Sequence, residues 1–481
     1  MHRSLALLVF FLTLASCLRP YYDSPPCVNV PETWRMDFDE GSTLCNLRWW
    51  EQFHDPVLNQ LIITALKNNQ DLQVAVNRVI EFYDQYRVVS SALLPLVTGT
   101  ASFNRVENSL VGPIPPTTGV PRITNDYQAF LNLSWELDFW GRVRSASDAA
   151  YAQMLSQIEA RRAVVVKVVS SVANAYITLR ALDGQLEVSK KTLESRIESL
   201  NLAQSRFELG ETSELEVIQA KAEAEIAIIS MIQFQRAIPI QENLISILLG
   251  ESPRAIERGI AIQAFQYPAN IPAGIPSDLL LRRPDILEAE DNLFATNALV
   301  SEARALFFPQ INLTSMYGSE SQKLHNLLIS PAEMWQYGIT AVQTLFDAGS
   351  IYYQFEEAKA VRQEAYFAYY QTILNAFREV EDGLDSYQKD RELVAEHQRQ
   401  VKILSDYLYL AQLRYNEGEI DYLNVLDAER SLFDAQLALV QAQADSFTSV
   451  VGLYSALGGG WVLDADNQAL DEVAIKIAEN R

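Results

Sequence analysis

Helical periodicity over long distances is the strongest pattern in the chain. Apolar and small residues recur at three- and four-residue intervals from Gly141 to Leu209, and a similar pattern runs from about Ile351 to Glu417. This spacing places them on one face of an α-helix. At about 1.5 Å per residue, each helix would span roughly 100 Å. A single globular core does not need helices of this length, whereas a coiled-coil-like bundle does.

Each long pattern ends at a Gly-Glu pair, Gly210-Glu211 and then Gly418-Glu419. Glycine often ends a helix because it adopts the left-handed backbone conformation easily. A second helical pattern follows each pair, with a side chain suited to capping it at Thr212 or Ser213 and at Asp421. These return helices are expected from about Glu214 to Leu248 and from the second pair to Leu457. The chain therefore contains two helical hairpins with Gly-Glu tips.

Between the helical stretches the period shortens to two residues. From Tyr127 to Leu137 the odd-numbered residues are apolar and the even-numbered ones mostly polar. This alternation has the length and pattern of a transmembrane barrel strand, in which Tyr127 and Trp135 would join an aromatic girdle. An amphipathic strand of a soluble sheet would look the same. Weaker candidate strands cover Val97 to Val106, Gln310 to Gly318 and Tyr337 to Phe346.

The second half of the chain repeats the plan of the first. Residues 206–223, RFELGETSELEVIQAKAE, and residues 414–431, RYNEGEIDYLNVLDAERS, are identical at six of eighteen positions. Asp71, the expected cap of an early helix, and Pro95, which follows that helix, recur as Asp285 and Pro309. Offsets of 208 and 214 residues indicate a duplicated domain and not a short solenoid repeat.

The duplication and the N-terminal pattern divide the chain into six segments. They are a signal segment at 1–16, a tether at 17–54, repeat 1 at 55–248, a connector at 249–276, repeat 2 at 277–457 and a C-terminal tail at 458–481.

The N-terminus has the features of a secretory signal. Arg3 precedes an apolar run from Leu5 to Leu12, which is followed by small residues and is too short to span a membrane as a helix. The run ends in Leu-Ala-Ser-Cys17, which resembles a bacterial lipoprotein box. That resemblance implies a covalent lipid on Cys17 and, because Leu18 follows instead of Asp, release to the outer membrane. An ordinary signal with a coincidental cysteine is the alternative.

Composition and charge exclude several functions. The formal net charge of −23, near −24 without Arg3, opposes nucleic-acid binding because nothing offsets phosphate repulsion. The four histidines are scattered without metal-ligand spacing, and no nucleophile-and-base constellation stands out. We therefore expect neither an enzyme nor any cofactor beyond the lipid. Cys27 and Cys45 could form a disulfide in an oxidising periplasm, but their spacing does not establish one.

The number of strands has a consequence for assembly. Four strands per chain cannot close a membrane barrel, since the smallest bacterial barrels have eight. An open strand edge in lipid would leave backbone groups without hydrogen bonds. Either the strands lie outside a membrane, or several chains build one barrel. Three chains would supply twelve strands and twelve helix passes, and the duplication would then give pseudo-sixfold symmetry.

The motifs as a set resemble the TolC-type outer-membrane efflux proteins, in particular the lipid-anchored NodT/OprM-like branch. The resemblance covers nearly the whole mature chain. The motifs that carry it are, in chain order, WWEQFHDPVLNQLI, NNQDLQVAVNR, ELDFWGRVR, RFELGETSELEVIQA, LLLRRPDILEAED, LFFPQINLT, LFDAG, FREVEDGL, RYNEGEIDYLNVLDAERS and LYSALGGGW.

The resemblance implies a mixed α+β membrane protein that assembles as a homotrimer. A twelve-stranded barrel in the outer membrane would continue into a long α-helical barrel in the periplasm, with an equatorial belt made from the tether, the connector and the tail. The implied function is the outer-membrane channel of a tripartite efflux pump for drugs or other small toxic compounds. Its implied partners are a periplasmic adaptor protein and an inner-membrane pump of the RND type. The alternatives are a conduit for type I protein secretion and a structural coiled-coil envelope lipoprotein without a pore.

The resemblance also implies a periplasmic gate on the second hairpin. Asp427 and Arg430 would pair with neighbouring helices, Tyr415 would take part in closure, and Leu423 would constrict the pore. The spacing of Asp427 and Arg430 alone indicates only an intrahelical pair worth a few tenths of a kcal/mol, and Leu423 could be a core leucine. The first repeat has Gln219 and Ala222 at the positions of Asp427 and Arg430, so the charged gate residues appear only on the second hairpin. The adaptor would dock at the tips, on Gly210, Glu211, Gly418 and Glu419.

Overall fold

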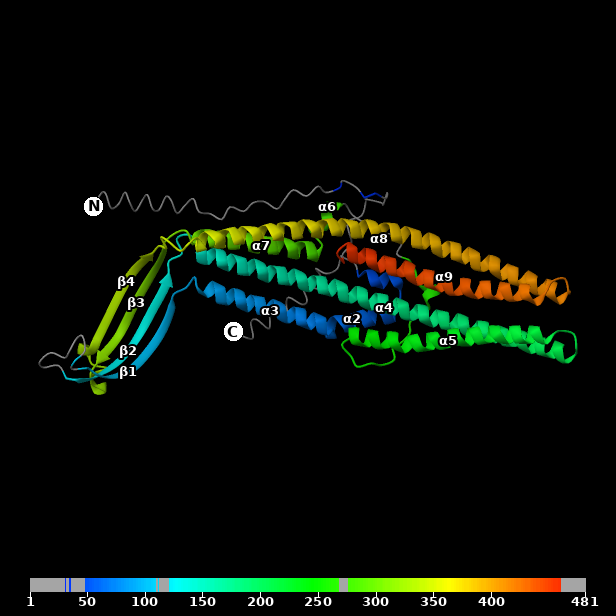
Figure 1. Ribbon diagram of the computed structural model, residues 1–481, viewed down its shortest axis with the longest axis horizontal. Helices are drawn as coiled ribbons and strands as arrows, with labels where there is room; N and C mark the ends of the chain where they lie inside the picture. Colours follow the sequence, from blue (N-terminus) through cyan, green and yellow to red (C-terminus); the bar gives the residue numbers. More distant parts are fainter. Residues whose placement is uncertain are drawn as a thin grey trace. The chain divides into compact units, whose positions relative to one another are not determined.

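The computed structural model describes residues 31, 34–35, 48–109, 111, 121–267 and 276–459 (Figure 1). These residues form two compact units. The strand unit comprises the described parts of 81–156 and 289–369, and the tip unit comprises those of 28–80, 157–288 and 370–481. Each unit draws on both repeats.

A four-stranded antiparallel sheet forms the strand unit, with the order β1-β2-β3-β4 (Figure 1). The strands are β1 (Leu96–Glu107), β2 (Ile123–Glu136), β3 (Gln310–Ser321) and β4 (Glu333–Val342). Phe103 lies opposite Tyr127 across β1 and β2, and the two rings stack with centroids 4.5 Å apart. The pairing of β2 with β3 joins the two repeats, since β2 belongs to the first and β3 to the second.

The two faces of this sheet differ in polarity. The register places odd-numbered residues of all four strands on one face, where Leu131, Tyr317 and Trp335 form a row across three strands. The even-numbered residues lie on the other face, where the Asn132 amide donates to the Thr100 hydroxyl at 3.1 Å. An apolar face opposite a polar one is what a strand between lipid and a watery lumen requires.

The expected position of the fourth strand, Tyr337 to Phe346, is wrong at both ends, since β4 already begins at Glu333. β4 stops at Val342, which pairs with Gln310, the first residue of β3. Pro309 precedes Gln310 and has no N–H to donate, so the ladder ends there. Leu345 and Phe346 follow as exposed residues outside the sheet.

Trp135, which the sequence places in an aromatic girdle, is hydrogen-bonded to the segment before β1. Its side chain is half-buried, and its indole N–H donates to the Leu93 carbonyl at 3.0 Å. Trp335 and Tyr337 on β4 are both exposed, and their rings stack with centroids 5.6 Å apart. The exposed aromatic surface of the sheet therefore includes the second repeat, which the alternation alone did not indicate.

The helices repeat with almost no change in length. α4 (Arg142–Glu208) and α8 (Ser350–Asn416) each have 67 residues, while α5 (Glu214–Leu248) and α9 (Tyr422–Ala456) each have 35. All four bounds of the first pair recur 208 residues later. α3 (Gln70–Ser91) and α7 (Pro284–Ala305) match at 22 residues each. The predicted internal duplication is confirmed.

Shorter elements complete the described chain. They are η1 (Trp49–Phe53), α2 (Pro56–Asn68), η2 (Ile262–Ala264), α6 (Pro276–Leu279), η3 (Leu324–Asn326) and η4 (Ser330–Ala332). Within the described residues, α4 also contains a stretch long and apolar enough to cross a membrane. Half of that stretch is buried inside the chain, as in the core helix of a soluble protein, so it is weak evidence for a span.

Helix starts follow the expected chemistry only in part. Asp55 caps α2, accepting hydrogen bonds from the N–H groups of Val57 and Leu58. The cap expected at Asp71 is wrong, because α3 already begins at Gln70. Asn69 caps the helix instead, and its side chain accepts from the Leu72 N–H at 3.1 Å.

The caps expected for the return helices are also wrong. Neither Ser213 nor Asp421 makes a side-chain capping bond. The Thr212 hydroxyl donates to the carboxylate of Glu216 instead of accepting from the backbone. The Thr212 side chain therefore bonds to another side chain near the tip and does not cap the helix.

Asp55 also anchors part of the connector to α4. Its carboxylate accepts hydrogen bonds from the Tyr176 hydroxyl at 2.9 Å and from the Ile260 N–H at 3.2 Å. The Tyr176 hydroxyl in turn accepts from the Gly259 N–H at 2.9 Å. Asp55 is fully buried, so it needs these donors, and a Cβ at Gly259 would collide with its carboxylate.

Candidate functional site: the two hairpin tips

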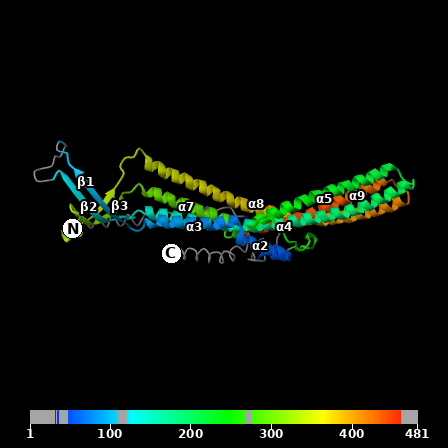
Figure 2. The same cartoon turned by 90° about the horizontal axis from the view of Figure 1, so that it is seen from below.

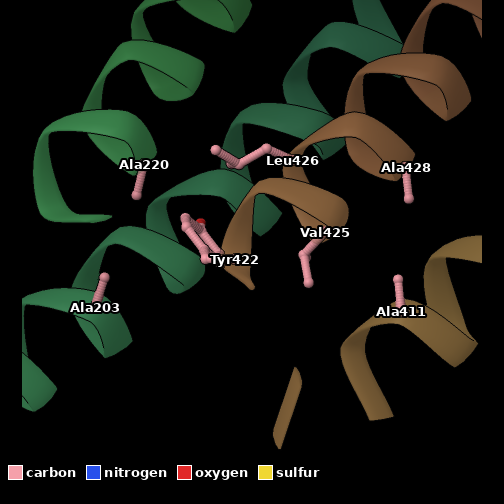
Figure 3. Close-up of a cluster of buried hydrophobic side chains, with 7 residues drawn as sticks. All are labelled: Ala203, Ala220, Ala411, Tyr422, Val425, Leu426 and Ala428. Carbon is pink, nitrogen blue, oxygen red and sulfur yellow. The ribbon is translucent and has the colours of Figure 1, made fainter. Parts of the chain in front are cut away.

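The two hairpin tips share a small apolar core made by all four long helices (Figure 3). The largest side chains of this core come from α9 and are Tyr422, Val425 and Leu426. Four alanines surround them, Ala203 and Ala220 from the first hairpin and Ala411 and Ala428 from the second. Each alanine of the first hairpin has its counterpart 208 residues later, so both repeats use the same small positions. Small side chains at these positions let the helices approach closely.

Glycine makes both tips in the same way. The Glu211 N–H donates to the Arg206 carbonyl and the Gly210 N–H to the Phe207 carbonyl, at 2.8 and 2.9 Å. Glu419 and Gly418 repeat the two bonds at 2.9 and 3.0 Å. This pair of bonds is the Schellman motif, which requires a left-handed residue after the helix. Gly210 and Gly418 supply it with φ values of 78° and 74°.

The acidic residues next to these glycines lie on the surface. Glu211 and Glu419 are both exposed, and the Glu419 carboxylate accepts from the Arg414 side chain at 3.0 Å. An exposed turn with its backbone bonds already made is suited to contact with another protein, because docking there leaves the helices unchanged.

Tyr415 joins α8 to each of the other three helices. Its hydroxyl donates to the Glu216 carboxylate of α5 at 2.8 Å. The Arg206 guanidinium of α4 lies over its ring, 5.3 Å from the centroid, and the ring of Tyr422 on α9 is also 5.3 Å away. Burial, followed by the bond to Glu216, raises the pKa of Tyr415, so the hydroxyl keeps its proton as a donor.

Arg430 links α9 to α5 across the two repeats. Its guanidinium forms a hydrogen-bonded ion pair with the carboxylate of Glu223. The Arg430 side chain is 52% exposed, whereas that of Glu223 is only 1% exposed. The bond to Glu223 raises the pKa of Arg430. The contact is therefore a surface arginine that reaches into a buried carboxylate.

Asp427 does not pair with Arg430, although the two lie three residues apart on one helix. Within the described part of the chain Asp427 makes no ion pair, and its carboxylate lies 3.4 Å from the Tyr407 hydroxyl of α8. The simple intrahelical pair that spacing suggests is thus absent from the described contacts. Of the two residues, Arg430 forms the ion pair between helices, and its partner Glu223 belongs to the first repeat.

Two more buried charges lie beside Glu223. Arg196 on α4 donates to the Glu223 carbonyl at 2.7 Å and lies 3.3 Å from its carboxylate. Glu429 on α9 accepts from the Ser199 hydroxyl at 3.4 Å. Burial raises the pKa of Glu429, an effect that the nearby Arg196 opposes, and burial lowers the pKa of Arg196. We call Arg196, Glu223, Glu429 and Arg430 the tip charge cluster.

Sequence patterns predicted only Arg430 of these four residues, since Glu429 was not expected at the gate either. Glu223 and Arg196 lie in the first hairpin, where no charged gate residue was expected, and no spacing links either one to Arg430. One usable signal is the position of Glu223 three residues after Ala220, on the buried face of α5. A charged residue on an apolar helix face needs a partner when it is buried.

Leu423 and its counterpart Leu215 do not lie in the protomer core. Leu423 is 59% exposed and Leu215 is 64% exposed. The interpretation of Leu423 as a core leucine of a single chain therefore does not hold, and the side chain is free to meet another chain or the pore.

The three cysteines lie outside the described residues, so neither the lipid on Cys17 nor a bond between Cys27 and Cys45 is addressed by the structure. Among the residues that are described, no group of His, Cys, Asp and Glu side chains is arranged to hold a metal ion.

Comparison with protein families finds a match that follows the duplication. A family model described as "outer membrane efflux protein" matches residues 61–251 and 275–459. Each matched segment covers most of one repeat, including its hairpin.

Two characterised relatives illustrate the range of the match. The toluene efflux pump outer membrane protein TtgC of Pseudomonas putida is 39% identical over 417 residues, covering 86% of this chain and 85% of the relative. The cation efflux system protein CusC of Escherichia coli is 32% identical over 455 residues, covering 94% and 97%.

Solved structures share the fold. The Campylobacter jejuni CmeC outer membrane channel superposes with a TM-score of 0.85 at 27% identity, over 93% of this chain and 98% of that one. The open state of the Neisseria gonorrhoeae MtrE outer membrane channel superposes with a TM-score of 0.82 at 29% identity, over 92% and 99%.

Proposed function

The chain belongs to the outer membrane efflux protein family, and on that premise we propose how its three copies form a channel that opens and closes at the hairpin tips. As a member of this family the protein is an outer-membrane efflux channel that extends into the periplasm, and it is a transport protein. Its fold is that of the trimeric TolC-like channels.

The sheet supports closure by three chains. β1 and β4 each have a neighbouring strand on one side only within the described sheet, so both outer edges are open. Open edges are not tolerated in lipid. Joining β4 of one copy to β1 of the next closes a twelve-stranded barrel, with the apolar face toward lipid and the polar face toward the lumen.

The gate rests on one observation, the ion pair between Arg430 and Glu223. Together with the bond from Tyr415 to Glu216, it ties the second hairpin to the first inside each protomer. Separating the hairpins at the tip requires both contacts to break. Arg430 and Tyr415 therefore act as closing contacts, with Leu423 facing the constriction and Asp427 near Tyr407 in a supporting position.

The family supports a proposal for the partners and the cargo. The exposed tips at Gly210-Glu211 and Gly418-Glu419 are the docking points for a periplasmic adaptor, which connects the channel to an RND-type pump in the inner membrane. The relatives compared above are named for export of toluene or of cations. The higher identity to the toluene protein favours small organic toxicants as cargo. Relatives named for efflux also favour this function over type I protein secretion.

Cys17 carries a covalent lipid in this proposal, which anchors the mature chain to the outer membrane. The mass of the mature N-terminal peptide tests the anchor, and replacing Cys17 by Ala removes the added mass. A disulfide between Cys27 and Cys45 is tested separately by peptide mapping with and without reduction.

The function is tested by complementation. Expression of the chain in a strain that lacks its own efflux channel, together with the cognate adaptor and pump, should restore resistance to toluene. The purified protein should also give single-channel conductance in planar lipid bilayers. A stable trimer that neither conducts nor complements would contradict the channel function.

A further inference from the structure

Arg196 is a nearly fully buried charge of the tip unit whose burial the gate contacts leave unexplained. Its side chain is 2% exposed, on α4, fourteen residues before the tip glycine Gly210. Long basic side chains are rarely buried completely unless they are paired. Its position behind the closing contact suggests a role in the gate itself.

Arg196 holds one residue by two different atoms. One terminal nitrogen donates to the backbone carbonyl of Glu223 at 2.7 Å, and the other lies 3.3 Å from the Glu223 carboxylate. The guanidinium also lies over the ring of Phe433, 5.0 Å from its centroid. The hydrogen bond fixes the Glu223 backbone, whereas the second contact is an ion pair without a hydrogen bond that keeps a positive charge beside the Glu223 carboxylate.

The geometry separates the partners of Glu223 into one fixed and one detachable cation. Arg196 and Glu223 belong to α4 and α5, the two arms of the first hairpin. Arg430 belongs to the second hairpin, reaches Glu223 from the surface and is half exposed. When the hairpins separate, Arg430 leaves with α9 while Arg196 stays beside Glu223.

We propose that Arg196 is the fixed counter-charge that allows the Arg430–Glu223 contact to open and close reversibly. A buried carboxylate without a cation is strongly unfavourable, and removing one partner of a buried pair is far more damaging than never having the pair. With Arg196 in place, the departing Arg430 leaves Glu223 still neutralised and correctly oriented. Arg196 is a positioning residue in this role, since its side chain is buried and acts through Glu223.

This inference rests on the proposed gate. It predicts that loss of Arg196 makes the channel open less often, whereas loss of the gate contact makes it open more often. In Arg196→Met, Glu223 is left with Arg430 as its counter-charge. Opening the channel then removes Arg430 and leaves the buried carboxylate without a neutralising cation. The variant should therefore stay closed more firmly than the wild type. In Arg430→Ala, the closing contact is gone while Arg196 still neutralises Glu223, so that variant should open more often.

The test counts spontaneous openings of the purified trimer in planar bilayers and measures toluene resistance in complemented cells. Arg196→Met should open at least about tenfold less often than the wild type, equivalent to about 1.4 kcal/mol, and should lose resistance at unchanged trimer level. Arg196→Lys, which keeps the charge, and Arg196→Met/Glu223→Gln, which removes both charges, should restore opening. Lys191→Met removes an exposed cation from the same helix and should behave as wild type.

The outcomes separate the two claims. If Arg430→Ala and Glu223→Gln both leave conductance unchanged, the proposed gate is wrong. If those variants open the channel and Arg196→Met opens it equally, the gate stands and the role assigned to Arg196 is wrong.

Loss of folding also gives an answer. If Arg196→Met yields no trimer, the double variant Arg196→Met/Glu223→Gln is compared with Glu223→Gln alone. Charge compensation predicts that the double variant assembles at least as well as the single one. A double variant that fails to assemble would show that Arg196 is needed for packing and would overturn the inference.

Discussion

Arg430 on α9 is bonded to Glu223 on α5, 207 residues earlier in the chain. The repeat counterpart of Arg430 is Ala222, and that of Glu223 is Ser431, so neither charge is duplicated. The apolar core of the same four helices contains the paired alanines, Ala203 with Ala411 and Ala220 with Ala428, which both repeats retain. The duplication thus provides the matching helix packing, and the later divergence of single residues provides the contact that can lock it.

Replacing Arg430 by Ala should raise the opening frequency in planar bilayers by roughly two- to fivefold per protomer. An ion pair with one exposed partner contributes up to about 1 kcal/mol, and Arg196 keeps Glu223 neutralised after the change. Asp427→Ala should have a smaller effect, because its described contact is a single long bond to Tyr407.

Arg399→Ala is the matched control for this prediction. It removes an exposed arginine of α8 that pairs with Glu396 on the same helix, so the hairpins remain joined. Equal conductance of the Arg430 and Arg399 variants would contradict the gate assignment.

Glu429→Gln should stabilise the protein at neutral pH and leave its stability unchanged near pH 4. Burial raises the pKa of Glu429 above the ordinary value of 4.5. A carboxyl whose pKa is raised by folding favours the folded state at low pH, and that contribution is lost as the pH rises through the raised value. Thermal unfolding of the trimer at pH 4 and pH 7 measures the difference.

Glu392→Gln provides a control of opposite sign. Hydrogen bonds from Lys389, and then from Gln388, lower the pKa of this exposed carboxyl. Its stabilising contribution is present at neutral pH and disappears on acidification, so the Gln variant should not gain stability at pH 7. A higher unfolding temperature for both variants would point to a general charge effect on this acidic chain.

Gly318→Ala should prevent formation of the barrel. A Cβ at this position of β3 would lie 2.0 Å from the Ala129 carbonyl oxygen of β2, so the central strand pair must separate. Gly338→Ala on β4 is the matched control, since its Cβ would meet only the Thr314 hydroxyl at 3.7 Å. The yield of heat-resistant trimer on gels distinguishes them, and equal yields would show that the sheet adapts.

Gly418→Ala should destabilise the second tip by about 1 to 2 kcal/mol, because an L-residue in the left-handed conformation is strained. No atom would obstruct the added methyl group, so the backbone conformation is the sole cause. Gly452→Ala, inside α9 and equally unobstructed, should instead stabilise the protein by about 1 kcal/mol. Hydrogen exchange at the tip and thermal unfolding measure the two effects, and changes of the same sign would contradict the assignment.

The sequence by itself determined the elements and their repetition. The long helices, the return helices and the Gly-Glu tips were predicted within a residue or two, because helix periodicity and the left-handed preference of glycine act over a few neighbouring residues. The spacing of the two copies then required a duplicated fold. Tyr415 and Arg430 were expected at the gate from the family motif, although their partners were not known.

Only the tertiary structure decided which distant groups meet. Glu223 and Arg196 became part of the site because α5 packs against α4 and α9 in the tip unit, where the four long helices run side by side (Figure 2). The end of β4 at Val342 likewise depends on where its partner β3 begins. Periodicity indicates that a face is buried but not what it is buried against, because that choice depends on the packing of helices far apart in the chain.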